Sequence, residues 1–331
     1  MPHPPFLLAR RRREGGLALS SLLESSLPRL ALTKKERRNP PTTQLSDFPR
    51  SSQQFLYYPF WRNHHAQLSN LEIFAFIASL FVLFATWIPW YRRAATINPL
   101  SLFPRIRLGF YIAPIVCLLF TLAILLTLGD KDVRRDPVYL TLYLTLTTAC
   151  LGITTRIFPL LGLSPREDVL ERANQAAFIA VCAALFGAAA AFAGANIGNL
   201  PGIEVVLFTA LLLAAIFLGS WFAVERLTSI SQAVTVDRNR HAGIRLAGFL
   251  LALGILTGWI GAGDWISYRA TLRDALVSLP AVLVLCSAFA YTESHFKKRK
   301  LAPSRESFLS LVSALLFVVL TCAWLTLRGI L

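Results

Sequence analysis

The chain has 331 residues, of which 55% are hydrophobic, and a formal charge of +15 at neutral pH. Its mean hydropathy of +0.56 is well above that of an ordinary globular domain. The basic residues gather in the first fifty positions and at the ends of apolar segments. That distribution is typical of a membrane protein's topology signal and argues against nucleic-acid binding.

Residues 1–69 differ in composition from the rest of the chain. They contain the basic runs Arg10–Arg13 and Lys34–Arg38, many Ser and Pro, and little periodic apolar pattern. This composition predicts a disordered basic tail. The apolar run 17–30 is interrupted by Glu24 and Pro28, which is unlike a secretory signal peptide. An organelle transit peptide and an open reading frame that begins too early remain as alternatives.

Eight apolar segments follow the tail. Each has close to the ~20 residues that a helix needs to cross the hydrocarbon core of a bilayer. Their lengths predict an all-α, polytopic transmembrane bundle of about eight helices, arranged as four tandem hairpins. The segments lie at 71–90, 108–128, 138–158, 174–195, 203–224, 244–262, 275–292 and 308–327.

The hairpins divide into a first hairpin (70–137), a repeat core of two hairpins (138–262) and a last hairpin (263–331). The loops after the first, third, fifth and seventh segments, counted together with Arg156 and Arg245 at the adjoining segment ends, hold sixteen Lys and Arg, against seven near the membrane on the other side. The positive-inside rule predicts that these odd-numbered loops are cytoplasmic and that both termini lie outside. The basic tail disagrees, but charges far from a span have little weight in that rule.

The fourth segment has a polar start and a lining of small residues. Ser164 is placed as an N-cap, with Pro165 at the first helical position and Glu167 three residues after the cap. Small residues then recur at steps of three and four, which predicts that another helix packs against this face. They are Ala177, Ala180, Ala184, Gly187, Ala191 and Gly194.

A shorter version of this arrangement returns 65 residues later. The stretch NQAAFI from Asn174 corresponds to NRHAGI from Asn239, and each has an Arg and an acid just upstream. Because each copy contains two spans, successive copies keep the same orientation and form a parallel repeat.

At these residues the chain resembles the DUF350 family of bacterial membrane proteins, which look like tandem two-span units. The resemblance covers about 138–292 and rests mainly on LERANQAAF and VDRNRHAGIRLAGFLLALGILTG. It implies a place in the bacterial envelope and implies no activity; we expect the membrane to be the bacterial cytoplasmic (inner) membrane. The extra hairpins and the long basic tail depart from the family's four-span form.

The two Asn form the candidate polar site. Equal units inserted with equal orientation should place Asn174 and Asn239 at the same depth, near the cytoplasmic ends of their helices. One interpretation makes each amide a staple to a neighbouring helix. The other makes the two Asn part of a site, shared with Arg172, Arg238 and Asp237, that binds an ion or a lipid headgroup.

A second polar feature lies in the third segment, where Thr141, Thr145, Thr148, Gly152 and Thr155 follow helical spacing. These hydroxyls either line a polar path or bond back to their own helix. The five cysteines all lie in apolar segments and none forms a CxxC pair, so the sequence predicts neither a disulfide framework nor a metal site.

No HExxH, GxSxG or Walker A motif occurs, and we expect neither an enzyme nor a bound cofactor. The acids Glu225 and Glu293 follow odd-numbered segments, where we expect them to pair with basic residues. The sequence favours a structural or accessory membrane protein whose partners are membrane lipids and either a membrane protein or a second copy of the chain. The alternative is a passive channel, or a transporter of ions or small solutes, with its polar site at the cytoplasmic ends of segments four and six.

Overall fold

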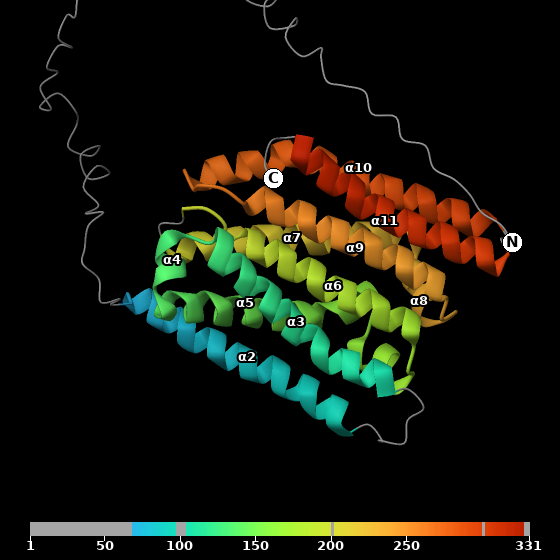
Figure 1. Cartoon of the computed structure of the whole chain (residues 1–331), viewed down its shortest axis with the longest axis horizontal. Coiled ribbons are helices and arrows are strands. Elements are labelled where there is room, and N and C mark those ends of the chain that lie inside the picture. Colours follow the sequence, from blue (N-terminus) through green and yellow to red (C-terminus); the bar gives the residue numbers. More distant parts are fainter. Residues whose placement is uncertain (1–67, 97–103, 200–201, 300–301, 328–331) are drawn as a thin grey trace, which may run out of the picture. The chain divides into compact units, whose positions relative to one another are not determined.

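The computed structural model describes residues 68–96, 104–199, 202–299 and 302–327 (Figure 1). The expectation for the tail 1–69 falls outside these residues, apart from Leu68 and Ser69. Eight helices in the described ranges are long and apolar enough to span a membrane, which confirms the predicted all-α bundle. They are α2 (Asn70–Thr96), α3 (Pro104–Leu128), α5 (Pro137–Ile157), α6 (Gln175–Gly194), α7 (Ile203–Thr228), α9 (Arg240–Gly261), α10 (Tyr268–Lys298) and α11 (Pro303–Leu327).

Short elements connect some of these helices. The helix α4 (Lys131–Arg135) joins the first hairpin to α5, and α8 (Ile230–Thr235) precedes α9. Between α5 and α6 the chain forms a 3₁₀ turn at Phe158–Leu161 and a π-helical turn at Pro165–Glu171. Ser164 caps the π-helical turn, because its side chain accepts a hydrogen bond from the backbone N–H of Glu167. The predicted cap is therefore present, but the long helix begins only after a second cap.

The helices α6 and α9 form the core of the bundle. They run side by side in Figure 1 and are the two most buried of the eight spans. The small-residue face of α6 lies against α9, and a Cβ added at Gly194 would overlap the carbonyl oxygen of Gly258. Close backbone approach of this kind is how helices associate in lipid, where escape from water provides no driving force. The predicted partner of the small-residue face is thus the equivalent helix of the second repeat.

The contacts between α6 and α9, which together form the α6–α9 seam, show that the two helices are parallel. Gly243 lies against Ala176 at one end, Gly254 against Gly187 in the middle, and Gly258 against Ala190 farther along. Residue numbers therefore rise together along both helices. This arrangement confirms the parallel repeat that the sequence predicts.

Backbone hydrogen bonds repeat at the same offset of 65 residues. Arg172 N–H donates to the Glu167 carbonyl, just as Asp237 N–H donates to the Gln232 carbonyl. The residue before each Asn has a left-handed backbone, with φ of 49° at Ala173 and 52° at Arg238. The turns that lead into α6 and α9 therefore share one conformation as well as one sequence pattern.

The loops at the other ends of α6 and α9 pair with each other. Gly263 N–H donates to the Ile197 carbonyl, and Asn199 N–H donates to Asp264 Oδ1 at 2.8 Å. Gly198 and Gly263, which are also 65 positions apart, have φ of 107° and 138°. Hydrogen bonds between the two repeats therefore join the loops at this end of the α6–α9 pair.

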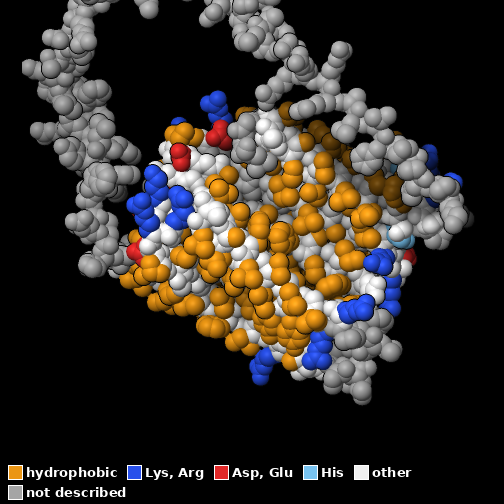
Figure 2. Space-filling model, viewed as in Figure 1, with side chains coloured by type: hydrophobic (Ala, Val, Ile, Leu, Met, Phe, Trp, Pro, Cys, Tyr) orange, Lys and Arg blue, Asp and Glu red, His pale blue; other side chains and the backbone are white. Residues whose placement is uncertain are grey.

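The two outer hairpins cover the repeat core in equivalent ways. In the first hairpin α2 packs on α5 and α3 on α6, while in the last hairpin α10 packs on α7 and α11 on α9. Large apolar side chains are exposed along α2, α3, α10 and α11, and the face in Figure 2 is largely apolar with its charges towards the edges. The exposed surface of these outer helices suits contact with lipid chains, and the chain is a multi-pass membrane protein.

Candidate functional site

Asn174 is the N-cap of α6. Its Oδ1 accepts hydrogen bonds from the backbone N–H groups of Ala176 and Ala177, at 2.9 and 3.3 Å. Its Nδ2 donates to the carbonyl oxygen of Val234 in α8, at 2.7 Å. The side chain is buried, with 2% exposure. The amide thus satisfies the first turn of one repeat and ties it to the other.

Asn239 is the N-cap of α9 and has the same local role. Its Oδ1 accepts from the backbone N–H groups of His241 and Ala242, at 2.8 and 3.1 Å. Its Nδ2 points to a different kind of partner, the carboxylate Oε1 of Glu306 in α11, at 3.3 Å. The repeat is therefore symmetric in its capping bonds and asymmetric in the second bond of each amide.

The other three residues of the predicted polar site do not join these amides. Arg172 forms an ion pair with Asp168 at 3.0 Å, and both Asp237 and Arg238 are exposed. Within the described ranges, no hydrogen bond or ion pair links any two of the five predicted side chains. The structure thus brings Asn174 and Asn239 to the adjacent starts of two packed helices but does not assemble the five into one cluster.

A charge cluster missed by the sequence analysis lies beside Asn239. Arg245 binds Glu293 through two hydrogen bonds, from Nε to Oε2 at 2.8 Å and from Nη2 to Oε1 at 3.1 Å. Its Nη1 donates to Ser310 Oγ at 2.8 Å and lies 3.8 Å from Glu306 Oε1. The guanidinium also stacks 4.2 Å from the ring centre of Phe296.

The cluster is buried inside the bundle and joins three helices. The side chains of Arg245 and Glu293 are only 3% and 1% exposed. Arg245 belongs to α9, Glu293 to α10, and both Ser310 and Glu306 to α11. Arg245 was grouped with the charges of the basic loops on sequence grounds, but it lies more than one turn inside α9, about 7.5 Å from the helix start at 1.5 Å per residue. Glu293 is paired with a basic residue, as expected, whereas Glu225 binds the backbone and hydroxyl of Ser231.

The cluster breaks the symmetry of the repeats. The position equivalent to Arg245 in the first repeat is Ala180, which is fully buried against the neighbouring helices. A sequence signal was present, since Arg245 is the only charged residue between His241 and Gly261. An ionisable residue inside a membrane helix marks a functional or structural site because its burial is unfavourable unless it is paired.

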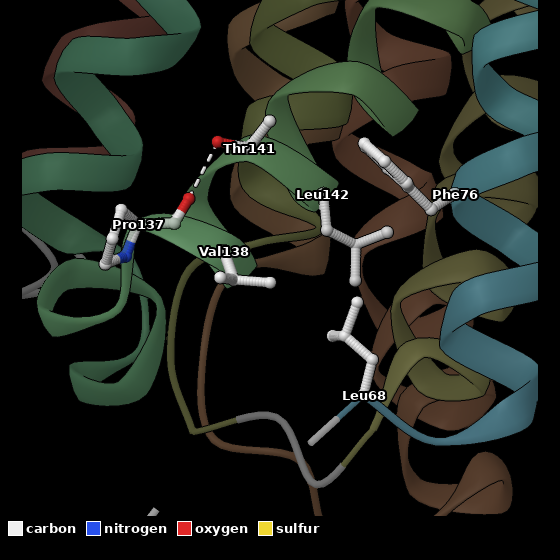
Figure 3. A pocket seen from close by; sticks show the side chains of 6 residues that line it. All are labelled: Leu68, Phe76, Pro137, Val138, Thr141 and Leu142. Atoms are coloured by element: carbon white, nitrogen blue, oxygen red, sulfur yellow. Dashed lines mark hydrogen bonds between the residues drawn. The ribbon is translucent and has the colours of Figure 1, made fainter. Parts of the chain in front are cut away.

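Three of the four Thr in the stripe on α5 bond back to their own helix. The hydroxyls of Thr141, Thr148 and Thr155 donate to carbonyl oxygens three or four residues earlier, at 2.6 to 2.7 Å. Figure 3 shows the bond from Thr141 to the Pro137 carbonyl beside an apolar crevice. This crevice is lined by Leu68, Phe76, Pro137, Val138, Thr141 and Leu142. These three bonds agree with the interpretation in which the hydroxyls bond back to their own helix.

The described residues contain no group of three or more His, Cys, Asp or Glu side chains that could hold a metal ion. All five cysteines are free thiols within helices. The chemistry that the cluster offers is therefore a bidentate guanidinium–carboxylate pair, with a hydroxyl, an amide and a second carboxylate around it.

Residues 132–260 match a family model described as Domain of Unknown Function (DUF350). The match begins in α4 and ends in α9, so it contains both Asn caps and Arg245. The residues that bind Arg245 in α10 and α11 lie outside the matched range. No curated protein and no solved structure gave a match to the chain.

Proposed function

We propose that this chain, whose residues 132–260 match the DUF350 family model, is a structural or accessory protein of the bacterial cytoplasmic membrane, without enzymatic activity. Its role would be to hold a fixed arrangement of helices in the bilayer. Its basic loops would contact lipid headgroups, and its exposed helices would contact a membrane protein or a second copy of the chain.

The closed seam between α6 and α9 carries this proposal. The two helices meet through backbone atoms at Gly194 and Gly258, and again at Gly187 and Gly254. Contacts of this kind leave no room for water or an ion between α6 and α9 at these positions. A polar conduit between α6 and α9 would need these two helices to separate. The hydrogen bonds between the loop after α6 and the loop after α9 oppose that movement.

The proposed orientation rests on the charge of the two ends, whereas the proposed membrane rests on the resemblance to a family of bacterial membrane proteins. The odd-numbered loops hold most of the Lys and Arg near the spans, and anionic lipid and insertion both favour such loops in the cytoplasm. We propose this orientation together with the structural role. Asn174 and Asn239 would then lie at the cytoplasmic ends of α6 and α9.

The second candidate is a channel or transporter that uses the polar residues at those ends. The buried Arg245 cluster favours it, because intramembrane charges often mark an ion path. Against it, Arg245 and Glu293 are already bound to each other in a two-hydrogen-bond pair. We therefore place the structural role first.

Flux through vesicles separates the two candidates. The purified full-length chain is reconstituted into phosphatidylglycerol–phosphatidylcholine vesicles, and efflux of potassium, chloride and protons is measured with fluorescent reporters. Vesicles without protein and vesicles with a known pore-forming peptide serve as controls. The structural role predicts efflux equal to that of protein-free vesicles, whereas reproducible efflux above that level would overturn it.

A further inference from the structure

The first two turns of α11 form a largely apolar crevice with a basic side chain at one end. Ser304, Arg305, Phe308 and Leu309 line it. Residues three and four apart lie on the same face of a helix, so the polar pair sits one turn nearer the helix start than the apolar pair. Most of the crevice surface is therefore apolar, and Ser304 and Arg305 mark its polar, basic end.

The polar end is positively charged without local compensation. Arg305 is exposed, and it forms no ion pair with any residue that the structure describes. The nearest acid in the sequence, Glu306, is turned toward α9, where Asn239 and Arg245 hold its carboxylate. Lys298 and Arg299 at the end of α10 are exposed and add positive charge to the same turn of the chain.

The apolar end continues into the exposed surface of α11. Phe308 is 67% exposed and Leu309 is 41% exposed. About one and two turns beyond Phe308, Leu311 and Leu315 are also exposed, so an apolar track runs away from the charged turn. A ligand that fits both ends has a negative group at one end and a hydrocarbon chain at the other.

We propose that this crevice binds one anionic phospholipid. The headgroup phosphate lies against Arg305 and the Ser304 hydroxyl, and an acyl chain follows Phe308 and Leu309 along α11. Arginine suits this role because its planar donors match phosphate oxygens. The proposal requires that the chain spans a bilayer, but it does not depend on the absence of ion flux.

Native mass spectrometry of the delipidated full-length chain tests the proposal. Phosphatidylglycerol and phosphatidylcholine are titrated separately, and the dissociation constant of the first bound lipid is measured. We expect phosphatidylglycerol to bind more tightly, and Arg305→Gln to weaken it about fivefold, the usual effect of one basic residue near anionic lipid. Phe308→Ala should weaken both lipids, because it removes the contact with the chain.

Arg92→Gln is the matched control, since Arg92 is an exposed arginine at the end of α2, on the first hairpin. It should leave phosphatidylglycerol binding within about twofold of the original chain. Equal losses for Arg92→Gln and Arg305→Gln would show diffuse attraction and overturn the site. So would unchanged binding in Arg305→Gln, or displacement of the lipid by inorganic phosphate with no effect of Phe308→Ala. Size-exclusion chromatography confirms that each variant is folded.

Discussion

Arg245 and Glu293 form a buried ion pair with two hydrogen bonds, which joins the second repeat to the last hairpin. Ser310 of α11 takes a third donor of the same guanidinium, so one side chain of α9 contacts both helices of that hairpin. The first repeat has no equivalent, because Ala180 occupies the corresponding position. The last hairpin is thus held by directional polar bonds as well as by packing.

Breaking this pair from one side should destabilise the bundle strongly. Glu293→Gln leaves the Arg245 charge buried with a weaker partner, and loss of one member of a buried pair typically costs about 3–5 kcal/mol. The double variant Arg245→Met with Glu293→Met removes both charges and should lie closer to the original chain than either single change. Denaturant titration in detergent micelles measures these free energies of unfolding. Single changes that each cost less than about 1 kcal/mol would contradict the assigned role.

The close contact along the α6–α9 seam can be tested with a matched pair of Gly→Ala substitutions. A methyl group at Gly194 would overlap the Gly258 carbonyl and push α6 from α9, so Gly194→Ala should lower the free energy of unfolding by about 1–3 kcal/mol. Gly219→Ala in α7 is the control, since nothing lies within 4 Å of the added Cβ. That change should be neutral or stabilising by up to about 1 kcal/mol, because Ala is the better helix former. Equal effects at the two positions would argue against a closed seam.

The two Asn caps should respond unequally to removal. Asn174→Ala loses the cap of α6, worth about 0.5–2 kcal/mol, and also leaves the buried Val234 carbonyl without its donor. Asn239→Ala loses the cap of α9 and one bond to Glu306, which is partly exposed and can be hydrated. We therefore expect the larger loss of thermal stability for Asn174→Ala. A larger loss for Asn239→Ala would show that the bond to Glu306 matters more than its geometry indicates.

The orientation of the chain can be measured with single cysteines. Ser304 and Asn199 are both exposed, and they lie on opposite sides of the membrane in the proposed topology. In intact cells an impermeant maleimide should label Asn199→Cys but not Ser304→Cys, and both should react after the membrane is permeabilised. The reverse pattern would mean that the basic tail, and not the loops, determines the topology.

Much of the fold could be predicted because its signals are local. Span positions follow from apolar length, and the packing of α6 on α9 follows from small residues at steps of three and four. The repeat was visible because NQAA and NRHA each begin a small-residue helix. The role of the two Asn was only partly predicted. An Asn directly before a helix is a typical N-cap signal, but the two Asn were expected to act as interhelical staples or as a ligand site.

The partners of Arg245 could not be predicted from the sequence. Glu293 is 48 positions away and Ser310 is 65 positions away, and no periodicity relates them to Arg245. Their meeting depends on how the last hairpin packs against α9, which hydropathy does not encode. The same reason explains why Asn239 and Asn174 differ in their second hydrogen bond.

Oxidative cross-linking between the loop after α6 and the loop after α9 tests the parallel packing of the repeats most directly. Asn199→Cys and Asp264→Cys replace two exposed residues that are joined by a hydrogen bond of 2.8 Å, on a background without the native cysteines. After mild oxidation and cleavage at a protease site inserted between them, the parallel arrangement predicts fragments that stay joined until a reductant is added. Asn199→Cys with Ser304→Cys should give separate fragments. Separate fragments from the first pair, or links that form only between two chains, would contradict the arrangement.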